Sequence, residues 1–204
     1  AAPGELALGS YVGDGTDDRS ITGLGFAPAY VMAMNADGLD AMQRYAAEVG
    51  DRSLPFQASD EKSDRIQALE SDGFQIGKNP TVNQLGKTVY YAAWSETSLG
   101  VSPGSYIGNT GDDRAITEAG FPPTYLLLTR RSNGSPTVQR MASMPEDFTL
   151  AVDRGIGFSD GVQRELPGGF EIGTSDMVNG DEQEYLWAAF RSSASLDLSV
   201  EKIA

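Results

Sequence analysis

The chain has 204 residues, of which 40% are hydrophobic, enough to bury the core of one large domain or two small ones. Lys and Arg total 15 against 29 Asp and Glu, and the net charge of −14 repels phosphate backbones and anionic lipid headgroups, so we expect neither nucleic-acid binding nor membrane insertion. The chain contains no His and no Cys, which excludes imidazole catalysis, thiol nucleophiles, disulfides and His or Cys metal sites.

The first residues, Ala-Ala-Pro-Gly, are the small residues that signal-peptidase cleavage leaves at the start of a mature protein. No apolar run reaches the roughly 18–20 residues of a membrane-spanning helix. We therefore expect a secreted, extracellular protein.

One long sequence motif occurs twice. Residues 9–26 read GSYVGDGTDDRSITGLGF, and residues 104–121 read GSYIGNTGDDRAITEAGF. Farther along, residues 63–74 (SDRIQALESDGF) match residues 159–170 (SDGVQRELPGGF), with the offset increased from 95 to 96 residues. One inserted residue explains this increase, and we expect it in the loop after residues 30–34. The sequence therefore indicates an internal duplication.

The duplication predicts two domains and a tail. We expect the first domain at residues 1–97 and the second at 104–193, joined by a short linker at 98–103. Residues 194–204 (ASLDLSVEKIA) have no counterpart in the first unit. Their apolar residues predict an extra strand that pairs with a sheet edge of its own chain or of a neighbouring copy. These candidate assembly residues are Leu196, Leu198, Val200 and Ile203.

The strands are expected in the same order in both units. Residues 30–34 (YVMAM) and 125–129 (YLLLT) are continuous apolar runs, which are typical of buried strands. Residues 39–47 could form a helical turn, but the matching segment 135–143 contains Pro136, which favours a strand. Further strands are expected at 73–77, 89–94, 169–173 and 185–190, and turns at Asn83, Gly86, Asn179 and Gly180.

About seven or eight short strands per unit predict an all-β fold class. The expected architecture is two tandem β-sandwiches, of jelly-roll or immunoglobulin-like type, that arose from the internal duplication.

A glycine-rich acidic loop recurs in both units and is a candidate cation site. Carboxylate and amide oxygens suit Ca²⁺, although their spacing here is not that of an EF-hand. The alternative is an Asx-rich turn between two strands, in which Arg19 or Arg114 neutralises an Asp. Neither interpretation requires a cofactor, and Ca²⁺ binding stays an open alternative. The candidate metal ligands are Asp14, Asp17, Asp18, Asn109, Asp112 and Asp113.

A pair of carboxylates could serve a glycosidase as acid and base. No carboxylate has an apolar sequence environment that would raise its pKa, however, so we expect no enzymatic activity. The acids that recur between the units all lie in expected turns: Asp17 with Asp112, Asp18 with Asp113, and Asp64 with Asp160.

The aromatic residues Trp94, Trp187, Tyr90 and Tyr91 have two interpretations. They could form a platform that stacks on sugars. Trp94 matches Phe190 in the second unit, however, and Tyr91 matches Trp187. Exchange among large aromatic residues at matched positions favours packing in a core.

These motifs resemble a known repeat. Its pattern is G-x-Y-x-G-[DN]-G-x-D-x-R-x-I-x-G-x-G-F-x-P, followed by I-Q-x-L-x-x-D-G-F-x-I-G, then V-N and Y-x-x-A-[WF]. It is similar to an all-β domain, often in tandem, of secreted bacterial proteins and of phage tail or appendage proteins. The second unit departs from the pattern at Asn109-Thr110-Gly111 and at Pro167-Gly168. The resemblance carries over no catalytic or ligand residue.

These observations favour a non-enzymatic extracellular structural protein, a subunit that self-assembles into a filament, sheath or surface layer through sheet edges and its terminal strand. The alternative is an adhesin-like module that binds carbohydrate or another surface ligand and could use Ca²⁺. The expected partners are further copies of the chain or a surface glycan.

Overall fold

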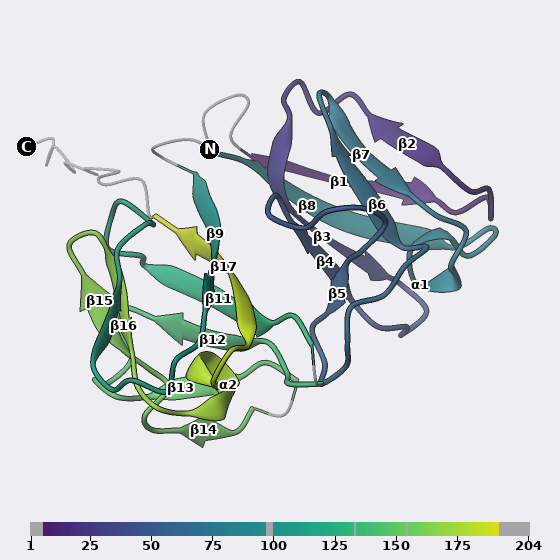
Figure 1. Ribbon diagram of the computed structural model, residues 1–204. Coiled ribbons are helices and arrows are strands. Elements are labelled where there is room, and N and C mark those ends of the chain that lie inside the picture. The colour runs from purple at the N-terminus through teal and green to yellow at the C-terminus, as the bar shows by residue number, and fades with distance from the viewer. Residues whose placement is uncertain (1–5, 97–99, 133, 154, 192–204) are drawn as a thin grey trace, which may run out of the picture.

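The computed structural model describes residues 6–96, 100–132, 134–153 and 155–191, and it confirms the all-β fold class (Figure 1). The ladders between its named strands are antiparallel. The only helices in this part of the chain are the single turns α1 (Pro80–Asn83) and α2 (Asp176–Asn179). Neither of these single-turn helices in the described ranges could span a bilayer.

The first unit has eight strands in two sheets. The larger sheet has the order β1-β8-β3-β4-β5, and the smaller sheet has the order β2-β7-β6. The strands are β1 (Leu6–Val12), β2 (Arg19–Thr22), β3 (Pro28–Asn35), β4 (Met42–Tyr45), β5 (Leu54–Pro55), β6 (Ile66–Glu70), β7 (Gly73–Ile76) and β8 (Thr88–Ser95).

The second unit repeats this arrangement and adds one strand. Its larger sheet has the order β9-β17-β11-β12-β13-β14, and its smaller sheet has the order β10-β16-β15. Matched strands therefore hold matched places, as the predicted duplication implies, and the order differs from the A-B-E-D sheet of immunoglobulin domains. The strands are β9 (Val101–Ile107), β10 (Arg114–Ile116), β11 (Tyr125–Arg130), β12 (Val138–Met141), β13 (Thr149–Ala151), β14 (Gly157–Phe158), β15 (Val162–Leu166), β16 (Gly169–Ile172) and β17 (Glu184–Phe190).

The structure differs from the sequence expectations in one boundary and in the structure around two asparagines. β9 begins at Val101, so part of the predicted linker 98–103 belongs to a strand. The residues Asn83 and Asn179, expected in turns, instead end the one-turn helices α1 and α2. The side chain of Asn79 caps α1 by accepting a hydrogen bond from the N–H of Thr81, a signal that the sequence contains.

Three hydrophobic cores hold the layers together. One lies between the two sheets of the first unit, and another lies between the two sheets of the second unit. The third, which we call the inter-unit core, is built from side chains of the two large sheets. Each large sheet is therefore covered on one face by its own small sheet and, over part of the other face, by the second large sheet.

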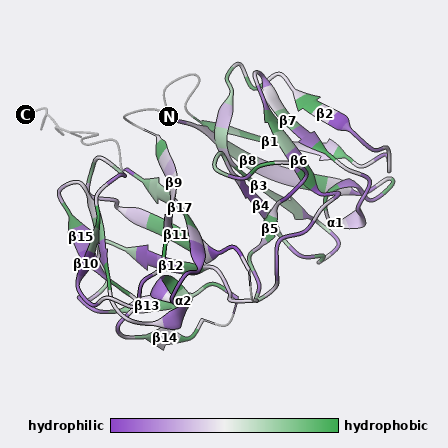
Figure 2. Ribbon diagram, in the orientation of Figure 1, coloured by the Kyte–Doolittle hydropathy of each residue, from purple (hydrophilic) through white to green (hydrophobic). Residues whose placement is uncertain are grey.

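This double coverage explains why the sequences of β3 and β11 are continuously apolar. In β3, Val31 and Ala33 enter the core of the first unit, while Tyr30 and Met32 pack in the inter-unit core. β11 repeats the pattern, with Leu127 in the inter-unit core. Figure 2 shows hydrophobic segments along strands of both units. A strand that is buried on both faces needs apolar residues at successive positions.

A buried amide joins the two units inside this core. The side chain of Gln43 donates from Nε2 to the hydroxyls of Thr129 (3.1 Å) and Thr137 (2.7 Å), and its Oε1 accepts from the hydroxyls of Tyr30 and Tyr45 (both 2.8 Å). A satisfied polar network of this kind fixes one relative orientation of the parts it connects, because any shift leaves a buried polar atom unpaired.

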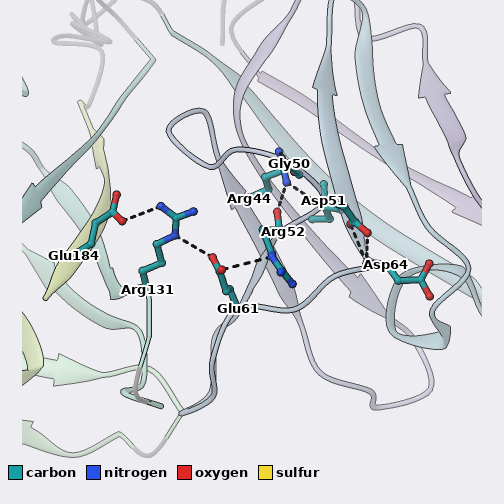
Figure 3. Close-up of polar contacts among 9 residues, drawn as sticks. Arg44, Gly50, Asp51, Arg52, Glu61, Asp64, Arg131 and Glu184 are labelled. Carbon is teal, nitrogen blue, oxygen red and sulfur yellow. Dashed lines mark hydrogen bonds and ion pairs between the residues drawn. The ribbon is translucent and has the colours of Figure 1, made fainter.

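An ion-pair chain borders the inter-unit core (Figure 3). Arg131 of the second unit contacts Glu61 of the first unit (3.0 Å) and Glu184 of its own unit (2.8 Å). Glu61 also lies 3.5 Å from Arg52. These charged side chains are partly exposed, so the ion pairs contribute little to the stability of the fold. They help to orient the two units relative to each other.

We expect Leu127→Ala to lower the free energy of unfolding by about 2–5 kcal/mol, because it opens a cavity in the inter-unit core. Urea denaturation followed by tryptophan fluorescence measures the change. The exposed Met34→Ala serves as the control and should change stability by about 0.5 kcal/mol or less. An equally small effect of Leu127→Ala would show that the two units do not pack against each other in solution.

Candidate functional site

The acidic glycine-rich loops are each tied to a fully buried asparagine. In the first unit, Asn83 Oδ1 accepts hydrogen bonds from the backbone N–H groups of Asp14 (2.9 Å) and Gly15 (3.3 Å), and its Nδ2 donates to the carbonyls of Thr16 (2.7 Å) and Gly77 (3.0 Å). Asn179 holds the loop of the second unit in the same way. The repeated Val-Asn pair of the sequence is thus the anchor of both loops.

The carboxylate of Asp14 is engaged inside its own loop. It accepts hydrogen bonds from the backbone N–H (2.9 Å) and the hydroxyl (2.7 Å) of Thr16, and it lies 3.3 Å from the guanidinium of Arg19. The hydrogen bonds from Thr16 lower the pKa of Asp14. These are the contacts of the expected Asx-type turn with a neutralising arginine.

The remaining predicted metal ligands make turn contacts too. Asp17 accepts from the side chain of Gln67 and from the N–H of the next residue, Asp18 (both 3.1 Å), and Asp112 makes the equivalent contacts. Asp18 and Asp113 adopt left-handed backbone angles, which Asp tolerates better than most residues. The six candidates lie three in each loop, and no group of three or more acids in the described residues could hold a metal ion. Ca²⁺ binding at these loops stays a prediction.

The Gly-x-Tyr motif that both units contain serves packing. The guanidinium of Arg19 lies over the ring of Tyr11, 5.4 Å from its centroid, and donates to the carbonyl of Val12 (2.8 Å). Gly9 lies directly beneath the ring of Tyr91, where a Cβ would overlap the ring atoms. The second unit repeats both features with the matched residues. The motif therefore encodes a local fold.

One buried carboxyl group contradicts a sequence expectation. Glu48 lies just after β4, is 5% exposed, and accepts a hydrogen bond from the N–H of Tyr45 (2.7 Å). Burial raises the pKa of Glu48 to about 8, against the opposing effects of that N–H and of Arg44. The expectation that no carboxylate has an apolar environment is therefore wrong for Glu48. Its burial depends on tertiary packing, which strand alternation does not reveal.

The raised pKa of its carboxyl group makes Glu48 a candidate general acid. It lines a small cleft of about 210 Å³ together with Arg44, Tyr45 and Leu69. Glycoside hydrolysis with two carboxylates needs a second one within about 5–9.5 Å. Glu48 is the only carboxylate among the described residues that line this cleft.

The four aromatic residues divide between core and surface. Trp187 is buried in the core of the second unit, and Tyr91 packs against the core of the first. Trp94 packs in the inter-unit core, where its ring centroid lies 5.2 Å from that of its counterpart Phe190. Core packing is thus confirmed for these three, while Tyr90 is 58% exposed. They do not form one sugar-stacking platform.

The strand β1 differs from the seven other strands at the edges of the described sheets. It has seven residues (LALGSYV), no charge and no proline. Among the others, β9 contains Pro103, and the rest have five residues or fewer. A long, uncharged edge strand presents unpaired N–H and C=O groups that readily accept another strand.

The register shows which backbone groups of β1 have no strand partner among the residues that the structure describes. The N–H of Gly13 donates to the carbonyl of Lys87 (2.8 Å), and β1 continues this pairing with β8. Because antiparallel pairs alternate, Ala7, Gly9 and Tyr11 direct their backbone groups toward β8. Leu6, Leu8 and Ser10 therefore direct theirs away from the sheet. We call this row the β1 edge.

Apolar side chains cover the outer surface of the sheet beside this edge. Tyr90 on β8 lies opposite Ser10 on β1 and Met34 on β3. Together with Leu8 and Val12, Tyr90 and Met34 form what we call the outer face. Their exposed fractions are 73% for Leu8, 57% for Val12, 56% for Met34 and 58% for Tyr90. Exposed apolar side chains that lie together on one face of a sheet are typical of interaction surfaces.

In the second unit, positions that correspond to the outer face are buried, and the edge strand that corresponds to β1 is blocked by a proline. Thr129 and Leu186, which correspond to Met34 and Tyr90, are buried beneath the first unit. Pro103 occupies the position of Leu8, with the same partner in its sheet. Proline has no N–H, so the β9 edge lacks the central donor that the β1 edge has.

An apolar cleft of about 490 Å³ adjoins the outer face at the junction of the units. Met34 and Tyr90 of the outer face line it, together with Met32, Tyr125 and Leu127. The outer face and the cleft thus form one continuous apolar region. The predicted assembly residues Leu196, Leu198, Val200 and Ile203 lie outside the described residues.

Sequence reasoning did not single out the β1 edge, although its signal was present in the contrast between LALGSYV and VSPGSYI. Comparison of the chain with protein-family models, with curated proteins and with solved structures finds no match. The features of the described residues that bear on function are the β1 edge, the outer face and the acidic loops.

Proposed function

We propose that this protein is a non-enzymatic structural protein whose copies associate through the β1 edge and the outer face, as subunits of an extracellular filament, sheath or surface layer. The observation that carries the proposal is the open β1 edge. It combines a long uncharged strand with exposed apolar side chains beside it. The location outside the cell is part of the proposal and is favoured by the sequence.

A strand added to the β1 edge would gain two kinds of interaction. Its backbone would pair with the open N–H and C=O groups of Leu6, Leu8 and Ser10. Its side chains on the outer surface would extend the apolar contact beside Leu8 and Val12, both more than half exposed. Burial of apolar area stabilises such contacts by about 25 cal/mol per Å². Backbone pairing gives affinity, and the adjoining side chains give selectivity.

The second unit supports this interpretation by contrast. It has the same fold and the same position in its sheet, but Pro103 blocks its edge and the first unit covers its outer surface. Natural sheet proteins commonly block their edges with proline or charge to prevent uncontrolled pairing. A chain that protects one edge and leaves the matched edge open is suited to pairing at that open edge.

The alternative, an adhesin-like module that binds carbohydrate, has weaker support. Of the four aromatic residues considered for sugar stacking, only Tyr90 is exposed. The carboxylates of the loops are engaged in turn contacts. A single exposed ring beside Met34 fits an apolar contact at least as well as a sugar.

We expect Leu8→Pro to abolish self-association without unfolding the protein. The substitution gives the β1 edge the residue that β9 carries at Pro103, where the same fold accommodates it. Sedimentation velocity over a concentration series measures association, and circular dichroism checks the fold. Ser10→Lys, which adds a charge to the same edge, is a second blocking variant, and Pro103→Leu should increase association.

Two results would contradict the proposal. One is unmodified protein that stays monomeric at all concentrations. The other is folded Leu8→Pro and Ser10→Lys protein that associates as strongly as the unmodified chain.

A further inference from the structure

We infer that the strand that pairs with the β1 edge is the segment 194–204 of a second copy of this chain. This inference rests on the proposed function, because it names the partner of the same edge. It follows from three considerations: which segments of the chain can supply a strand, how the residues of this segment alternate, and where the described chain ends.

Few segments of the chain can supply a strand long enough to match β1. Every described strand is already paired on at least one side, and of the edge strands only β1 and β9 exceed five residues. Pro103 removes the central donor of β9. Apart from β1 itself, the remaining segment with an apolar alternating pattern is 195–201 (SLDLSVE).

The pattern of this segment fits the surface beside β1. Leu196, Leu198 and Val200 alternate with Asp197 and other polar residues, so an extended segment has one apolar side and one polar side. If this segment pairs with the β1 edge, its apolar side would continue the outer face. Its polar side would then lie at the margin of the small sheet. The segment 195–201 has seven residues, as β1 does.

The place where the described chain ends favours a second copy as the donor. Phe190, the last residue of β17, packs 5.2 Å from Trp94, and Trp94 is the partner of Leu6 at the start of β1. The chain therefore leaves the described structure near the Leu6 end of the β1 edge. A segment that continued along its own edge would run parallel to β1, which is a less stable pairing than the antiparallel one found throughout these sheets. A second copy can approach in the antiparallel direction.

The assembly that follows is an open chain of subunits. The donor segment and the acceptor edge are different surfaces of one molecule, so each copy can donate to one neighbour and accept from another. Heterologous contacts of this type build filaments unless the rotation between subunits closes a ring. Pairing of β1 with β1 would instead give a closed dimer with two-fold symmetry.

The test uses full-length variants that block one side of the contact each. Leu8→Pro blocks the acceptor edge and keeps the segment 194–204 intact. Leu198→Asp places a charge on the apolar side of that segment and keeps the edge intact. The matched control, Ser199→Asp, adds the same charge to the polar side. We expect Leu198→Asp to weaken self-association about tenfold or more, and Ser199→Asp to change it by about twofold or less.

Mixing the two blocked variants separates the possible partners. Leu8→Pro and Leu198→Asp should each be monomeric alone and form a one-to-one heterodimer when mixed, as measured by sedimentation velocity. If Leu198→Asp alone still associates as the unmodified chain does, the inference is overturned while the proposed function stands. If neither mixing nor concentration changes the mass of any form, including the unmodified chain, the proposed function fails.

A labelled peptide of residues 194–204 gives an independent readout. It should bind the Leu198→Asp protein and not the Leu8→Pro protein in fluorescence anisotropy. Equal binding to both proteins, or binding to neither, would overturn the assignment of this segment to the β1 edge.

Discussion

The inter-unit core determines how the two units are arranged and which of their surfaces stay exposed. It brings the two large sheets together, so that each sheet is covered by its own small sheet and by part of the other unit. Successive residues of β3 and β11 must therefore all be apolar or internally paired. Gln43 on the neighbouring strand β4 is also buried, and its polar side chain is satisfied because its amide binds partners in both units. This core fixes which surfaces of the duplicated fold remain available.

The duplication gives two units the same strands but not the same environment. The packing buries Leu186 of the second unit and leaves the matched Tyr90 of the first unit exposed. The edge strands of the two units differ as well, because Pro103 of β9 occupies the position that Leu8 has in β1. A pair of units that began as equivalent copies thus has one apolar, open side. That asymmetry underlies the proposed association through the β1 edge.

Much of the fold could be predicted from the sequence, because the duplication and the strand patterns are local signals. The offset of the two copies located the inserted residue, and Pro136 correctly favoured a strand over a helix at 39–47. The turn contacts of Asp17 and Asp112 were also foreseeable, since Asx-rich loops have a known local chemistry. Alternation does not tell what covers a face, however. Trp94 therefore could be assigned to a core but not to the inter-unit core.

The burial of Glu48 and the exposure of the outer face also escaped sequence reasoning, because both depend on how the sheets pack. The β1 edge was within reach, since Leu8 and Pro103 occupy matched positions in the two copies. Recognising it required the strand order, which places β1 and β9 at the margins of their sheets. The difference between Leu8 and Pro103 indicates an open edge only when the strand order is known.

Amide hydrogen exchange of β1, measured on the full-length protein at low and high concentration, reports directly whether copies pair at the β1 edge. We expect the N–H groups of Leu8 and Ser10 to exchange rapidly in dilute solution and to become protected as copies associate. Those of Gly9 and Tyr11 should be protected at both concentrations, because they pair with β8. Associated protein in which Leu8 and Ser10 remain unprotected would contradict pairing at the β1 edge.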